Sequence, residues 1–117
     1  MVSDAQMREL VLKFPETQEK SHFGHPDFRV SNRIFATLWP EQRRAVLRLT
    51  PEDQAAAIHS NPEIFKIPSS SGRGGWTSVD LARVDEGEFR ELVHKAWAAL
   101  PRPRPRKEVA RKRAAGQ

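Results

Sequence analysis

The chain has 117 residues, of which 38% are hydrophobic and 30% charged, and this composition suits a single globular domain around one hydrophobic core. It contains no run of eighteen apolar residues, which excludes a membrane-spanning helix, and its first ten residues lack the features of a secretory signal. It has no cysteine, which excludes disulfides and thiolate metal ligands and fits a reducing compartment. We therefore expect a soluble, cytoplasmic protein.

Positive charge is concentrated at the C-terminal end. The net charge is +5, but residues 101–117 hold seven Lys or Arg and one Glu, which gives +6. Residues 1–100 hold thirteen basic and fourteen acidic groups, which gives −1. The sequence therefore predicts a nearly neutral domain over residues 1–100 and a basic, Arg/Pro-rich, flexible tail over residues 101–117.

The first predicted element is a helix over residues 3–13. Ser3 and Gln6 have the spacing of a capping box, in which each side chain accepts a hydrogen bond from the other's backbone N–H. Apolar residues then recur at helical spacing, at Met7, Leu10, Val11 and Phe14. Pro15 ends the pattern.

Three short strands are predicted next. β-branched and aromatic residues are enriched over residues 27–30, 33–38 and 45–49, and turn signals separate these segments at 31–32 and 39–42. Connections this short favour antiparallel neighbours.

A second helix is expected to begin after Thr50, with Pro51 at its first position, and to end near residues 61–62. Residues 63–67 and 76–81 are predicted as two further strands, separated by a loop rich in Gly and Ser. A last helix begins at residues 85–88 and carries the clearest apolar stripe: Phe89, Leu92, Val93, Ala96, Trp97 and Leu100.

The resulting order, α-β-β-β-α-β-β-α, predicts an α+β fold. We expect a two-layer sandwich in which a mostly antiparallel five-stranded sheet has its helices on one face. In such an arrangement no helix needs to cover the opposite face of the sheet.

Three short motifs resemble one family. Residues 22–30 (HFGHPDFRV), 33–36 (RIFA) and 74–76 (GGW) are similar to the MmcQ/YjbR-like family of small bacterial proteins, and the likeness extends over residues 1–100. The resemblance implies a secretion-chaperone-like α+β fold. Members are often labelled DNA-binding, because two β-hairpins look like a pair of wings, and the family supplies no catalytic residues. The Arg-Pro tail lies outside the resemblance.

The tail is a candidate nucleic-acid contact. Alternating prolines favour an extended polyproline-II path, which spaces the cations along the chain so that they can follow a phosphate backbone. These cations are Arg102, Arg104, Arg106, Lys107, Arg111, Lys112 and Arg113. If all seven met phosphates of duplex DNA, the logarithm of affinity would fall with the logarithm of salt at a slope of about −6. The alternative is a solvated tail that only aids solubility.

The uncovered face of the sheet is the second candidate. Alternation predicts that Ile34, Ala36 and Leu38 face the helices. It predicts an outward set that mixes guanidinium groups with aromatic rings: Arg29, Arg33, Phe35, Trp39, Arg48 and Trp76. Bases can stack on such a surface, at about 1–3 kcal/mol each. The alternatives are a dimer interface, or aromatic rings folded into the rim of the core.

Two further patterns are weaker. His22, His25 and Asp27 are metal-ligand types, but positions three apart on a strand point to opposite faces, so we expect a turn-stabilising histidine pair and no metal. The loop at 69–75 lacks the Gly-Lys-Ser/Thr ending of a nucleotide-binding loop and precedes a strand. Arg73 in that loop could still meet a phosphate.

These features together predict a small, non-enzymatic protein that binds nucleic acid, DNA first, with little sequence preference and without cofactor or metal. The tail would supply most of the affinity, and hairpins carrying Arg29, Arg73 and Trp76 would orient the complex. One alternative is a protein-interaction module or homodimer. Another is a small-ligand or enzymatic site near His22, His25 and Trp76.

Overall fold

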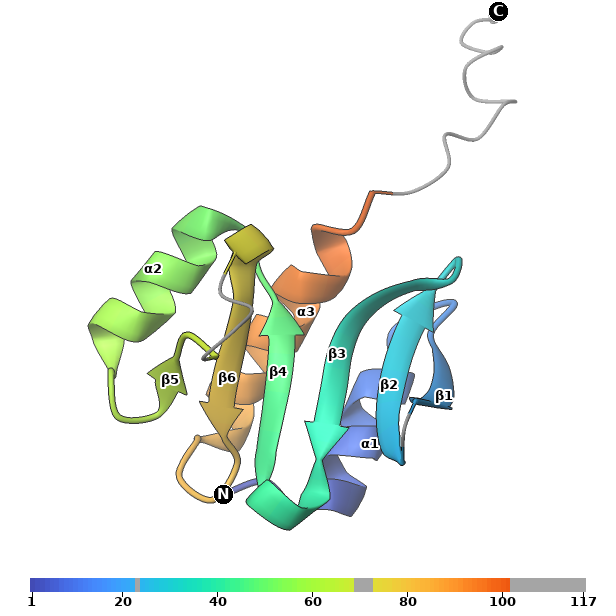
Figure 1. The fold of residues 1–117 in the computed structure, drawn as a ribbon, viewed down its shortest axis with the longest axis horizontal. Coiled ribbons are helices and arrows are strands. Elements are labelled where there is room, and N and C mark those ends of the chain that lie inside the picture. The colour runs from blue at the N-terminus through green and yellow to red at the C-terminus, as the bar shows by residue number, and fades with distance from the viewer. Residues whose placement is uncertain (23, 69–72, 102–117) are drawn as a thin grey trace, which may run out of the picture.

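The computed structural model describes residues 1–22, 24–68 and 73–101, which form three α-helices and a six-stranded sheet (Figure 1). The helices are α1 (Asp4–Leu12), α2 (Pro51–Ser60) and α3 (Glu86–Ala98). The strands are β1 (Gln18–His22), β2 (His25–Val30), β3 (Arg33–Trp39), β4 (Arg44–Arg48), β5 (Phe65–Lys66) and β6 (Trp76–Asp80). Two single-turn 3₁₀-helices, at Pro40–Gln42 and Arg73–Gly75, join neighbouring strands. None of the described helices combines the length and the hydropathy that crossing a bilayer requires.

The sheet has the order β1-β2-β3-β4-β6-β5, and every pairing among its described strands is antiparallel. The predicted α+β class and the three helices are confirmed. The predicted count of five strands is wrong, because β1 forms an additional edge strand beside β2. Its sequence, QEKSH, is polar throughout, so it carries no apolar alternation from which a strand could be predicted.

Local side-chain caps explain where the helices begin. The Ser3 hydroxyl accepts from the Gln6 backbone N–H at 3.1 Å, and the Gln6 side chain accepts from the Ser3 N–H at 2.8 Å, which confirms the predicted capping box. Thr50 accepts from the Asp53 N–H at 3.1 Å at the start of α2. Asp85 caps α3 in the same way.

The helices leave one face of the sheet uncovered. Figure 1 shows α1 and α3 behind the sheet and α2 beside its β5 end. The core lies between the sheet and the helices and includes four fully buried phenylalanines: Phe28, Phe35, Phe65 and Phe89. No helix of the described residues covers the face of β3, β4 and β6 that is turned toward the viewer in Figure 1, and the candidate site lies on that face.

A bulge in β3 changes which side chains reach that face. Phe28 pairs with Ala36, whereas the next residue, Arg29, pairs with Ile34, so Phe35 has no residue opposite it. Because of this extra residue, Phe35 and Ala36 are both fully buried and Ile34 shares the outer face with Arg29. The predicted orientations of Phe35 and Ile34 are therefore wrong, since simple alternation does not anticipate a bulge.

Two glycines bring β6 close to β4. Gly74 and Gly75 have φ angles of 80° and 89°, a left-handed conformation that favours glycine. A Cβ added at Gly75 would lie 1.7 Å from the backbone oxygen of Leu49, whereas one added at Gly74 would meet nothing within 4 Å. The Leu49 N–H donates to the Gly75 oxygen at 2.9 Å, which fixes the start of β6 and thus the position of Trp76.

Candidate functional site

The uncovered face is hollowed into a groove of about 540 Å³ that crosses β3, β4 and β6. Its lining mixes aromatic, cationic and small groups, which include Trp39, Trp76, Arg44, Lys66, Val46 and Thr37. Ile67, 57% exposed, lies at the edge beyond β5. No Asp or Glu is among the described residues that line the groove.

The two cations of the groove, Arg44 and Lys66, come from neighbouring parts of the sheet. Neither Arg44 nor Lys66 forms a salt bridge within residues 1–22, 24–68 and 73–101. The Nε atom of Arg44 is buried and has no hydrogen-bond acceptor in that part of the chain. Because a buried N–H without a partner costs about 1–3 kcal/mol, an acceptor brought by a ligand would be favoured here.

Trp39 is held in place at one end of the groove. Its indole N–H donates to the Thr37 hydroxyl at 3.0 Å, and the His25 ring lies against it with a centroid distance of 3.9 Å. The Nε2 atom of His25 lies 3.3 Å from a carboxylate oxygen of Glu41. A bond to its own backbone N–H, and then the bond to His25, lower the pKa of Glu41 below its ordinary value. These contacts fix the orientation of the indole without filling the groove.

His22 and His25 lie at the same end of the sheet. His22 and His25 are register partners at the end of the β1–β2 pair, but nothing is described of the His22 side chain, and that of His25 contacts Trp39 and Glu41. Within the described ranges, no three His, Asp or Glu side chains lie close enough together to hold an ion.

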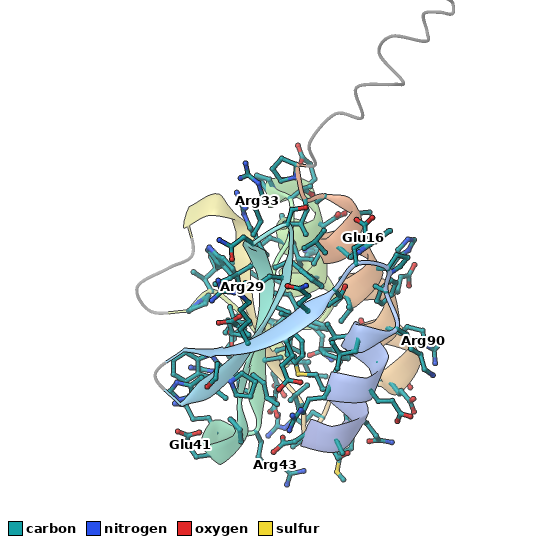
Figure 2. All side chains as sticks on the ribbon, turned by 90° about the vertical axis from the view of Figure 1, so that its right-hand side faces the viewer. Glu16, Arg29, Arg33, Glu41, Arg43 and Arg90 are labelled. Carbon is teal, nitrogen blue, oxygen red and sulfur yellow. The ribbon has the colours of Figure 1, made fainter. Side chains whose placement is uncertain are left out.

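Arg29 lies on the outer face as predicted, but its guanidinium is occupied. Figure 2 shows it on the side of the sheet opposite α1, away from Arg90. It donates to both carboxylate oxygens of the buried Asp27, at 2.7 and 3.1 Å, and to Asn32 at 2.9 Å. The hydrogen bond to Asp27 is the main cause that raises the pKa of Arg29. The stability that the charge of Arg29 contributes is thus fully present below the ordinary arginine pKa and is lost as pH rises through the raised value.

The other predicted site residues differ in where they lie and in whether the structure describes them. Arg33 is exposed at the start of β3, where it pairs with Val30, and it does not line the groove. Arg48 is the register partner of Trp76, yet it lines a separate cavity of about 290 Å³ near the start of α2. The Arg73 side chain and the tail cations from Arg102 to Arg113 lie outside the described residues.

The two cations of the groove were not predicted as site residues. Arg44 alternates with Val46 and Arg48 on the outer side of β4, but the predicted strand began one residue too late to include it. Lys66 follows the buried Phe65 in β5, so alternation already pointed it outward. In each case the period-two pattern contained the signal.

Comparison with known proteins places the chain in a family. A sequence model of the YjbR family matches residues 12–99. Among solved structures, the crystal structure of Deinococcus radiodurans protein DR2400, a DUF419 domain, is similar with a TM-score of 0.73 and 18% identity. That likeness covers 97% of this chain and 82% of the other, and at this identity it supports the fold alone. No curated protein matches the chain. Because the family match spans most of the sequence, the chain belongs to the YjbR family.

Proposed function

We propose that this protein binds nucleic acid with little sequence preference, through the open face of its sheet and its basic tail, and catalyses no reaction. The observation that carries the proposal is the groove, in which Trp39 and Trp76 accompany the cations Arg44 and Lys66, with no carboxylate among the described residues of its lining. Indole rings can stack on bases of any identity, while guanidinium and ammonium groups neutralise phosphates. A groove of this composition therefore suits a ligand that is both aromatic and anionic.

The tail supports the same ligand by charge. The +6 of residues 101–117 stands beside a domain of −1, so the attraction of the whole chain for a polyanion comes mainly from its C-terminal end. DNA is the proposed nucleic acid. The cytoplasm is the proposed compartment, because the chain has no cysteine that could form a disulfide in an oxidising compartment.

The charge contribution predicts a steep salt dependence. Between about 50 and 200 mM salt, the full-length chain is expected to lose duplex affinity with a log–log slope of about −8, of which about −6 comes from the seven tail cations and about −2 from Arg44 and Lys66. A chain ending at residue 101 is expected to show a slope of only about −2, from Arg44 and Lys66. Fluorescence anisotropy with a labelled duplex measures both slopes.

A full-length variant with the seven tail cations changed to glutamine is the matched control for chain length. It is expected to reproduce the shallow slope of the truncated chain, because charge and not length sets the slope. Absence of binding by the full-length chain to any DNA or RNA at the lower salt concentration would overturn the proposed function.

A second candidate is a small aromatic anion as the ligand of the same groove. The volume of about 540 Å³ lies within the range of small-molecule sites, roughly 300–1,000 Å³. The sequence analysis considered a ligand site near His22, His25 and Trp76. In the structure, His25 lies against Trp39, which is at the other end of the groove from Trp76. Binding of a mononucleotide as tightly as an oligonucleotide would favour this candidate.

A further inference from the structure

We propose that the groove is a site for an unpaired, extended strand, with Trp39 and Trp76 stacked on two separate bases and Arg44 and Lys66 contacting the backbone. This inference rests on the proposed function and deepens it, since charge alone does not separate single strands from duplexes. It is carried by the position of the two indoles in the sheet and by the buried Nε of Arg44 beside them, which has no hydrogen-bond partner among the described residues.

The register of the sheet sets the distance between the two indoles. Trp39 is the partner of Arg44, and Trp76 is the partner of Arg48, on opposite sides of β4. Arg44 and Arg48 are four residues apart, which corresponds to about 13 Å along the strand, and two strand spacings add about 9–10 Å across it. The two backbones are therefore about 16 Å apart on the diagonal. We expect the two rings to stack on separate bases, which requires a ligand of more than one nucleotide.

Stacking on these rings requires bases whose faces are free. In a duplex each base face is covered by its neighbours, and only base edges and phosphates are presented to a protein. Unpaired bases can be splayed out and stacked on aromatic side chains. Two indoles set apart on an open sheet can therefore stack on the bases of a single strand. An intact duplex would contact this face only through its phosphates.

The two cations lie on the β5 side of the diagonal that joins the two indoles. Arg44 is the immediate neighbour of Trp39, and its buried Nε lacks an acceptor in the described part of the chain. Lys66 pairs with Ser78, in the row of the sheet that separates the two tryptophans. The nearly buried Val46 pairs with Ser78 in the same row and gives the groove an apolar floor there. A nucleic-acid strand that crosses this floor would meet Arg44 beside the first base and Lys66 farther along its path.

The test compares a thymidine single strand of about twelve nucleotides with the matching duplex at one salt concentration, using the full-length chain. Trp39→Leu and Trp76→Leu are each expected to weaken single-strand binding about fivefold to hundredfold while leaving duplex binding unchanged. Trp39→Phe and Trp76→Phe, which keep a ring, are expected to recover most of the loss. Arg44→Gln is expected to weaken binding of the single strand several-fold.

Two variants on the helix side serve as controls. Trp97→Phe removes an indole whose N–H donates to the Pro15 oxygen, and Arg90→Gln removes a cation from the face opposite Arg29 (Figure 2). Both are expected to bind the single strand within about twofold of the unchanged protein, well inside the effect of losing one stacked base. The near-ultraviolet circular dichroism of each variant verifies that the chain is folded.

Three outcomes would overturn this inference. Equal binding of single strand and duplex, with no effect of the tryptophan variants, would leave the proposed function standing and remove the single-strand site. Binding of thymidine monophosphate as tightly as the oligonucleotide would make the groove a small-ligand site. Absence of binding to either nucleic acid would remove the proposed function itself.

Discussion

Replacing Gly75 with alanine is expected to destabilise the domain by about 3–5 kcal/mol, the combined cost of an overpacked contact and a left-handed backbone strain. The added Cβ would lie 1.7 Å from the Leu49 backbone oxygen, and no side-chain rotation can relieve a contact between a Cβ and a backbone atom. The start of β6 would have to move away from β4, and the hydrogen bond from the Leu49 N–H to Gly75 would be lost with it.

The adjacent glycine is the matched control. Gly74 has nearly the same φ angle, 80° against 89°, but a Cβ there meets nothing within 4 Å. Gly74→Ala is therefore expected to cost only the backbone strain, about 1–2 kcal/mol. Urea unfolding of the two variants, compared at equal m-values, gives the difference. Equal costs at the two positions would contradict the close approach of β6 to Leu49.

Phe35→Ala is expected to lower the free energy of unfolding by about 3–5 kcal/mol, the usual cost of emptying a fully buried phenylalanine site. The expectation depends on the bulge in β3, because only the extra residue there turns Phe35 into the core. A regular strand would place the ring on the open face, where truncation costs far less.

Ile34→Ala is the control for this position. Ile34 is half-buried and lines the groove on the open face, so its truncation is expected to cost about 1 kcal/mol or less. The two free energies of unfolding come from the same denaturant titrations. A larger cost at Ile34 than at Phe35 would show that β3 alternates regularly.

Features that depend on local chemistry could be predicted from the sequence. The capping box of Ser3 and Gln6 and the Thr50 cap are set by residues three positions apart, and the structure contains both. The turn at Ser31 and Asn32 was also anticipated, and both residues adopt positive φ angles. The bulge at Phe35 could not be predicted, because it depends on how β3 matches its neighbours and not on the residues of β3 alone.

The candidate site was predicted in part for the same reason. Alternation correctly placed Trp39 and Trp76 outward, since Trp39 lies beyond the bulge of β3 and Trp76 lies in β6, whose register with β4 is regular. Alternation alone did not predict that Arg29 forms an ion pair with Asp27. The two residues are two positions apart on one strand and therefore share a face, so the pair could have been inferred. Arg44 was missed because strand boundaries are the least certain feature of a sequence pattern.

The indole N–H signals of the isotope-labelled full-length chain test the central claim most directly, because two of its three tryptophans line the groove and the third packs on the helix side. On addition of a thymidine single strand of about twelve nucleotides at low salt, the Trp39 and Trp76 signals are expected to shift while the Trp97 signal stays in place. Binding of the strand with the Trp39 and Trp76 signals unchanged would contradict a nucleic-acid site on the open face of the sheet.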